Sequence, residues 1–115
     1  MDELLIDIND LLERTMSDEE VAKEVLNCFI IETEHVVTKI KQSIDNIDLV
    51  QIREFAHELK GASASAGAIK IMKLSESMQK LAEQENYNEI KNISSDLYTS
   101  FQSTITEIKS LDLMK

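Results

Sequence analysis

The sequence contains no proline, no tryptophan and only two glycines in 115 residues. A β-rich domain needs Gly, Pro, Asn and Asp at tight turns every roughly 8 to 12 residues, and that density of turn residues is missing here. The single cysteine, Cys28, excludes an intramolecular disulfide and a zinc site built on cysteine pairs. We expect it to be a buried or half-buried reduced thiol. These absences favour an all-α protein, and the length fits one domain spanning residues 1–115.

Long apolar runs and an excess of positive charge are also missing. The longest apolar runs are a few residues, too short to span a membrane, and the acidic N-terminus lacks the basic start of a signal peptide. Lys and Arg number 12 against 22 Asp and Glu, a formal net charge of -10. A surface of this sign does not hold the phosphate backbone of nucleic acids. We therefore expect a soluble, cytoplasmic protein that neither inserts into membranes nor binds nucleic acid.

Apolar residues recur at spacings of three and four almost throughout the chain, which is the period of an amphipathic helix. This pattern predicts five helical segments. The residues that carry this pattern are, in chain order, Leu4, Leu5, Ile8, Leu11 and Leu12; Val21, Val25, Phe29, Val36, Ile40 and Ile44; Ile52, Phe55, Leu59, Ala62 and Ala66; Ile69, Met72, Ser75, Met78, Leu81 and Ala82; and Ile90, Ile93, Leu97, Phe101, Ile105 and Ile108.

Polar residues at the segment boundaries predict where these helices begin and end. Three pairs have the spacing of N-terminal caps: Ser17 and Glu20, Asp48 and Gln51, and Asn86 and Glu89. The second segment is expected to end near Asp45 and Asn46, the third at Gly67 and the fourth around Glu85. Because the connections are only a few residues long, consecutive helices should be antiparallel neighbours. The expected architecture is an antiparallel, up-down four-helix bundle with a short additional N-terminal helix.

The third segment carries a histidine on the side opposite to its apolar residues. At about 100° per residue, most of its apolar positions lie between about 140° and 200° from His57. By the same count Lys60, Gly61 and Ala64 lie within about 60° of His57. The sequence therefore predicts that His57 is exposed in the middle of a helix, with a lysine and a glycine beside it.

Gly61 is an unusual residue for a helix interior, where glycine costs about 1 kcal/mol relative to alanine. Nothing on the predicted buried face requires a small residue there. The absence of a side chain one turn from the imidazole would let the surface of another molecule approach His57 closely. Lys60 places beside the same ring a cation that can hold the oxygens of a phosphoryl group. These neighbours predict a phosphohistidine site that is open to a protein partner.

Histidine-containing phosphotransfer (HPt) domains of two-component phosphorelays have a signature that resembles the string His57-x-Leu59-Lys60-Gly61-Ala62-Ser63-x-x-x-Gly67-Ala68. The resemblance implies a four-helix bundle in which His57 accepts a phosphoryl group from the phospho-aspartate of one receiver domain and passes it to the aspartate of another. It implies that Gln79, on the next helix, is hydrogen-bonded to the histidine ring and fixes its orientation. Ala62 stands where many relatives have serine, so Ser63 is the expected helper hydroxyl. Because the sequence has no Gly-rich ATP-binding domain, we expect no autonomous kinase activity.

The resemblance also implies the partners, which are response-regulator receiver domains and a hybrid histidine kinase. We expect no metal site and no bound cofactor in the chain itself, and we expect Mg²⁺ on the partner receiver domain. Docking should be transient, with an apolar centre and polar edges, and a monomer would keep the transfer face open. The residues expected to form the docking surface are Ile8, Leu11, Leu12, Gly61, Ser63 and Ala64.

Three other interpretations share some of these residues. The run from His57 to Lys60 is similar to the first four positions of the His-Glu-Leu-Arg-x-Pro motif of histidine kinases, but the chain has no proline and no Gly-rich ATP-binding domain. Glu32-x-x-His35 and Glu54-x-x-His57 match the spacing of di-iron ligands in helical bundles, but neither histidine faces the predicted core. A non-catalytic helical adaptor that docks receiver or kinase domains without phosphotransfer is the open alternative, supported by the broad apolar face of the first segment.

Overall fold

The computed structural model describes residues 5–115 and is helical throughout, with α-helices and one short 3₁₀ helix, η1. The elements are α1 (Ile8–Arg14), α2 (Glu19–Asp45), α3 (Leu49–Ala66), α4 (Ile69–Glu83), α5 (Tyr87–Ser110) and η1 (Asp112–Met114). No strand occurs in residues 5–115, so the predicted all-α class is confirmed. Leu4 of the first predicted segment lies outside the described residues, and α1 begins only at Ile8.

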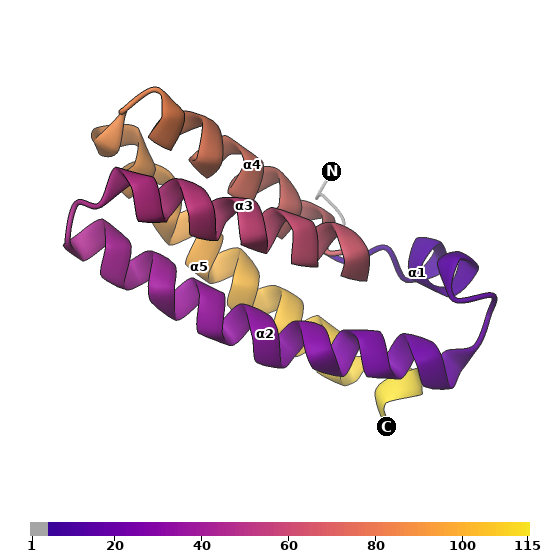
Figure 1. Cartoon of the computed structure of the whole chain (residues 1–115). Coiled ribbons are helices and arrows are strands. Elements are labelled where there is room, and N and C mark those ends of the chain that lie inside the picture. Colours follow the sequence, from indigo (N-terminus) through magenta and orange to yellow (C-terminus); the bar gives the residue numbers. More distant parts are fainter. Residues whose placement is uncertain (1–4) are drawn as a thin grey trace.

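The four long helices pack around one core, and consecutive helices run in opposite directions (Figure 1). α3 contacts α2 and α4, while α5 contacts α4 and α2, so the four helices close a ring. The Tyr87 hydroxyl at the start of α5 donates a hydrogen bond to the Ile44 carbonyl near the end of α2, at 2.6 Å. α1 lies at the end of the molecule where α2 begins (Figure 1). Within residues 5–115 no helix is both long and apolar enough to cross a membrane.

The helix starts agree with the sequence at two of the three predicted caps. The side chains of Asp48 and Asn86 each accept a hydrogen bond from the backbone N–H three residues later, at 3.1 and 3.3 Å. The predicted cap at Ser17 is wrong, because Asp18 accepts from the N–H groups of Glu20 and Val21, at 3.0 and 3.2 Å. Ser17 has a φ of 62° and belongs to the turn that ends α1. The local signal was therefore correct in kind and displaced by one residue.

The C-terminal ends of α1 to α4 have the same backbone conformation. At the end of each of α1 to α4 a residue adopts a left-handed conformation, and the N–H that follows it bonds back to a carbonyl five residues earlier, as in a Schellman motif. These left-handed residues are Met16, Ile47, Gly67 and Glu85. Only Gly67 is the residue type that this conformation favours. The reason is steric, because a Cβ on Gly67 would lie 2.9 Å from the Asp7 carbonyl oxygen.

Replacing Gly67 by alanine is expected to lower the free energy of unfolding by about 2 kcal/mol, because the new side chain adds a clash to a left-handed backbone. The Asp7 backbone cannot retreat without losing the hydrogen bond from its N–H to the Gly67 carbonyl, at 2.7 Å. Urea unfolding measures the loss. Gly61→Ala is the matched control: no atom lies within 4 Å of the added Cβ, and removing a helix glycine should raise stability. Equal effects of the two substitutions would contradict this account.

Ile47 is a β-branched residue at a position that favours glycine. Its φ is 53° and its side chain is 62% exposed, so it carries backbone strain and gives little burial in return. Ile47→Gly is therefore expected to stabilise the protein by about 1 kcal/mol. The comparison variant is Val50→Gly, an exposed residue in the first turn of α3, which should destabilise it. A loss of stability in both variants would show that Ile47 is not strained.

The buried face of α2 differs from the predicted one. Val21 is 43% exposed and Val25 is half-buried, so their assignment to the core is wrong for Val21 and only partly correct for Val25. Ala22 and Leu26 are fully buried in their place. The helix is therefore rotated by one position relative to the predicted stripe near its start. This rotation leaves apolar side chains of α2 on an open surface beside α3.

Candidate functional site

His57 lies in the middle of α3 and is exposed, as predicted. The buried face of α3 is formed by Ile52, Ala56, Leu59, Ser63 and Ala66. This face packs between α2 and α4, so the imidazole points away from the core on a helix held from both sides. A rigid helix with an outward imidazole is a fixed platform for a reacting group.

Gln79 of α4 is placed next to the His57 ring. The Gln79 side-chain oxygen Oε1 lies 3.4 Å from His57 Nδ1, and the Gln79 Nε2 group donates to Oε1 of Glu83 at 3.3 Å. Because Glu83 is an acceptor, it turns the NH₂ of Gln79 toward itself and the amide oxygen toward the ring. The neutral tautomer that satisfies this contact has its proton on Nδ1 and its lone pair on Nε2. The contact that the resemblance implied for Gln79 is therefore present.

Lys60 and Gly61 follow His57 by three and four residues on α3. Lys60 is half-buried and Gly61 is exposed. No atom outside the local helix backbone lies within 4 Å of the position that a Cβ on Gly61 would occupy. Packing in the folded protein therefore does not require glycine at position 61. The cost in stability of Gly61 in a helix interior is not explained by packing.

α1 is hydrogen-bonded to the C-terminal end of α3, which follows His57 along the helix. Arg14 donates from Nη2 to the Ala64 carbonyl at 3.1 Å and pairs with Asp10 at 3.1 Å. Ala64 is exposed, whereas Ile8 and Leu12 of α1 are half-buried. With Gly61, which is also exposed, four of the six predicted docking residues therefore keep accessible surface.

The other two predicted docking residues, Leu11 and Ser63, are buried. Leu11 is 1% exposed, because it is the residue of α1 that packs into the core. Ser63 is fully buried, since it lies on the α3 face that packs against the neighbouring helices, and its hydroxyl oxygen has no hydrogen-bond partner among residues 5–115. Neither side chain can contact a docked protein, so both docking predictions are wrong. Ser63 also points away from the His57 face, so the expected helper hydroxyl is not at the ring.

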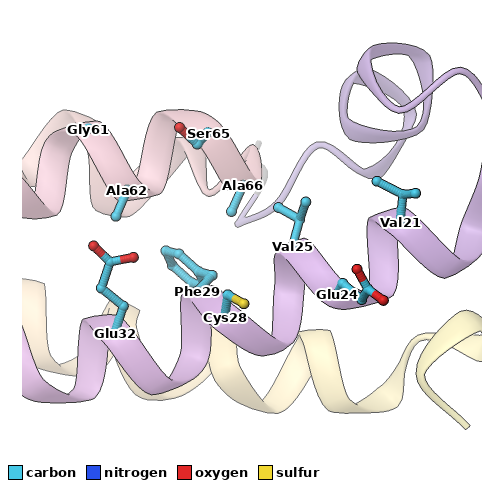
Figure 2. A pocket seen from close by; sticks show the side chains of 10 residues that line it. All are labelled: Val21, Glu24, Val25, Cys28, Phe29, Glu32, Gly61, Ala62, Ser65 and Ala66. Carbon is cyan, nitrogen blue, oxygen red and sulfur yellow. The ribbon is translucent and has the colours of Figure 1, made fainter.

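A groove between α2 and α3 was not predicted from the sequence. Figure 2 shows Val25, Phe29 and Glu32 rising from α2 toward α3, with Ala62 and Ala66 pointing back from α3. The groove has a volume of about 510 Å³ and is lined by Val21, Glu24, Val25, Cys28, Phe29, Glu32, Gly61, Ala62, Ser65 and Ala66. Cys28 is exposed there, so its expected burial is wrong. The rotation of α2 that exposes Val21 could not be read from apolar spacing alone.

The second histidine, His35, is exposed on α2. It lines a smaller cavity of about 250 Å³ in the same α2–α3 seam, together with Phe55 and Glu58. No group of three or more His, Cys, Asp or Glu side chains in residues 5–115 is placed to hold a metal ion.

Charge is distributed unevenly between the helix pair that carries His57 and the rest of the chain. Residues 49–83 hold five Lys or Arg and four Glu, whereas the remaining residues hold seven Lys or Arg and 18 Asp or Glu. The α3–α4 pair is therefore close to neutral in a strongly acidic protein. An anionic group approaching His57 therefore meets less repulsion from this helix pair than it would from the rest of the chain.

An exposed histidine whose ring contacts Gln79 on an all-helical scaffold is the arrangement expected of a phosphotransfer domain, and comparison with known proteins agrees. The family model of the Hpt domain matches residues 24–110, and the chain belongs to this family. The fold is similar to the crystal structure of histidine-containing phosphotransfer protein B (HptB) from Pseudomonas aeruginosa PAO1, with a TM-score of 0.86 and 17% identity over 94% of each chain. A comparison with curated proteins gave no significant match.

Proposed function

We propose that this protein is a phosphorelay intermediate that accepts a phosphoryl group on His57 from the phospho-aspartate of one receiver domain and passes it to the aspartate of another. The observation that carries the proposal is the exposed imidazole whose Nδ1 faces Gln79 at 3.4 Å. Membership of the Hpt family supports a phosphotransfer role in two-component signalling. We propose that residues 1–115 act as one domain, with α2 to α5 as the antiparallel bundle and α1 as an additional helix.

The reaction that this geometry supports is an in-line displacement at phosphorus. The Nε2 lone pair of His57 attacks, a P–N bond forms as the P–O bond to the aspartate breaks, and the carboxylate leaves with the electron pair. The ring gains positive charge, because Nδ1 keeps its proton. Gln79 Oε1 accepts from this N–H and so stabilises the charge that develops on the ring. The same steps in reverse pass the phosphoryl group to a second receiver.

Two further residues beside His57 would bind the phosphoryl oxygens and leave room for the partner. The Lys60 ammonium would neutralise charge on these oxygens, and the open space at Gly61 would admit the rim of the receiver's active site. We assign Mg²⁺ to the receiver, where it neutralises phosphoryl charge. The proposed partners are response-regulator receiver domains and a hybrid histidine kinase, met by a cytoplasmic monomer whose transfer face stays open. Ile8, Leu12, Gly61 and Ala64 are the docking contacts that remain from the sequence prediction.

The test is transfer from a receiver domain carrying a radiolabelled phosphoryl group, in the presence of Mg²⁺. The label is expected to move to this protein, to resist base and to be lost in acid, as a phosphoramidate does, and then to pass to a second receiver. Incubation with ATP alone should leave the protein unlabelled. Binding of the receiver without uptake of label would contradict the proposal and favour the adaptor alternative.

Gln79→Leu is expected to lower the transfer rate about tenfold, because it removes one hydrogen bond to a ring that becomes charged, worth about 1.5 kcal/mol. Single-turnover transfer at saturating receiver measures the loss. Gln42→Leu, an exposed position on α2, is the matched control and should transfer normally. Glu83→Ala should give a smaller loss, because it frees the Gln79 amide to rotate without removing it. Normal transfer by Gln79→Leu would show that the amide does not orient the ring.

A further inference from the structure

We propose that the α2–α3 groove is a specificity subsite of the docking face, and that it selects receiver domains presenting an apolar side chain flanked by Lys or Arg. The inference rests on the proposed phosphotransfer function and names the kind of receiver that this chain prefers. Three observations support this inference. The groove has exposed apolar side chains, it is continuous with the face that carries His57, and one of its walls is negatively charged.

The floor and one edge of the groove are apolar, and the side chains of the edge are accessible. Val21 is 43% exposed and Val25 is half-buried, although both have the spacing of core residues. Phe29 and Ala62 complete the floor between the two helices (Figure 2). A volume of about 510 Å³ lies within the range of roughly 300–1,000 Å³ typical of clefts that bury a ligand of several groups. The groove therefore has room for one or more apolar side chains of a partner.

The groove is continuous with the face that a receiver must cover. Gly61 lines the groove and follows His57 by one helical turn. Ser65, one turn further along α3, lines it as well. A receiver that brings its aspartate to His57 lies over Gly61, so its surface also lies over the mouth of the groove. The occupant is thus the receiver itself and not a separate protein.

The charge of the groove comes from one wall only. Glu24 and Glu32 line it from α2, and the residues contributed by α3 are uncharged. In the described part of the chain neither carboxylate forms a hydrogen bond or an ion pair. Two unpaired carboxylates beside an apolar floor attract a basic side chain and repel an acidic one. The matching receiver surface therefore carries Lys or Arg next to its apolar residue.

The first experiment reverses the charge of this wall. A receiver domain is phosphorylated with acetyl phosphate and Mg²⁺ and is chosen because it transfers to the wild-type protein. The double substitution Glu24→Lys and Glu32→Lys should raise the KM for this receiver about tenfold, leave the rate at saturation unchanged and flatten the dependence of KM on NaCl concentration. Glu34→Lys is the matched control on α2, because Glu34 faces a cavity shared with α5 and should leave KM unchanged. Circular dichroism confirms that each variant is folded.

The second experiment uses Cys28 as a reporter, since it is the only cysteine and its side chain lines the groove. The same receiver, bound to the protein, should slow the reaction of Cys28 with a thiol reagent at least fivefold. A Cys28→Ser, Ser95→Cys variant moves the thiol to an exposed position on α5 and should show no protection.

The outcomes separate this inference from the proposed function. A raised KM together with protection of Cys28 supports the groove as the subsite. Transfer to His57 with an unchanged KM and an unprotected Cys28 overturns the inference and leaves the phosphotransfer function standing. If Cys28 is protected but the KM of the double variant is unchanged, the receiver covers the groove without being selected for basic residues. That result overturns the proposed selection by charge. If no receiver transfers to the wild type, the proposed function fails, and the inference that rests on it fails with it.

Discussion

The His57→Gln variant is expected to take up no phosphoryl group from any phosphorylated receiver domain. Glutamine fills similar space on the outer face of α3 but has no nitrogen lone pair that can attack phosphorus, because its amide lone pair is delocalised. His57 is exposed, so the substitution should leave the fold and its stability close to those of the wild type. The measurement is label transfer over a time long enough for the wild type to reach equilibrium.

The control for this variant is His35→Gln, which removes the other histidine of the chain. His35 is also exposed, so the two substitutions differ in position and not in chemistry or burial. His35→Gln should transfer at the wild-type rate. Residual transfer in His57→Gln, or a loss in His35→Gln, would place the acceptor elsewhere than on α3.

The Gly61→Gln variant is expected to transfer about 100-fold more slowly than the wild type, because a displacement of reacting groups by about 1 Å can cost a factor of this size. The new side chain would stand in open space one turn from His57, where the receiver must approach. It meets no atom of this protein within 4 Å of its Cβ, so the helix content should not change. Single-turnover transfer and circular dichroism together separate a blocked approach from a damaged helix.

Gly61→Ala separates the size of the side chain from the flexibility of glycine. It should stabilise the protein by about 1 kcal/mol and retain most of the transfer activity, because one methyl group obstructs little. If Gly61→Ala and Gly61→Gln were equally slow, the role of glycine would be backbone flexibility. If Gly61→Gln transferred normally, the steric explanation for this glycine would be wrong.

The sequence predicted the helices well because apolar spacing and capping residues are local signals. Asp48 and Asn86 cap the helices that they were expected to cap, and Gly67 ends α3. The exposure of His57 was predicted from the angular positions of the residues around the helix, since the apolar residues of one helix mark its own buried face. Gln79 entered only through the family resemblance, because no local pattern shows that two helices bring its amide to the ring.

The errors come from features that depend on the packing of several helices. Val21 fits the apolar period, yet α2 turns Ala22 and Leu26 inward, because the ring of four helices sets its rotation. Leu11 and Ser63 were placed on the docking face, although the structure buries both. In each case one helix alone offers two acceptable faces, and only the neighbouring helices decide between them.

The groove and the left-handed helix ends could not be predicted for related reasons. Ile47 and Glu85 adopt positive φ without being glycine, so no residue type marked those turns. The groove arises where α2 and α3 meet beside Gly61, and it exposes Cys28, which was predicted to be buried or half-buried. A surface that two helices make together has no signature in the spacing of either one.

The decisive measurement for phosphotransfer through His57 locates the phosphoryl group on the intact protein after transfer from a phosphorylated receiver. Nitrogen-15 spectra of the histidine side chains, recorded in base, resolve both rings and distinguish the two ring nitrogens. We expect one modified ring, that of His57, with phosphorus on Nε2 and a proton on Nδ1 facing Gln79. Phosphorylation of Nδ1, of His35 or of no histidine would contradict it.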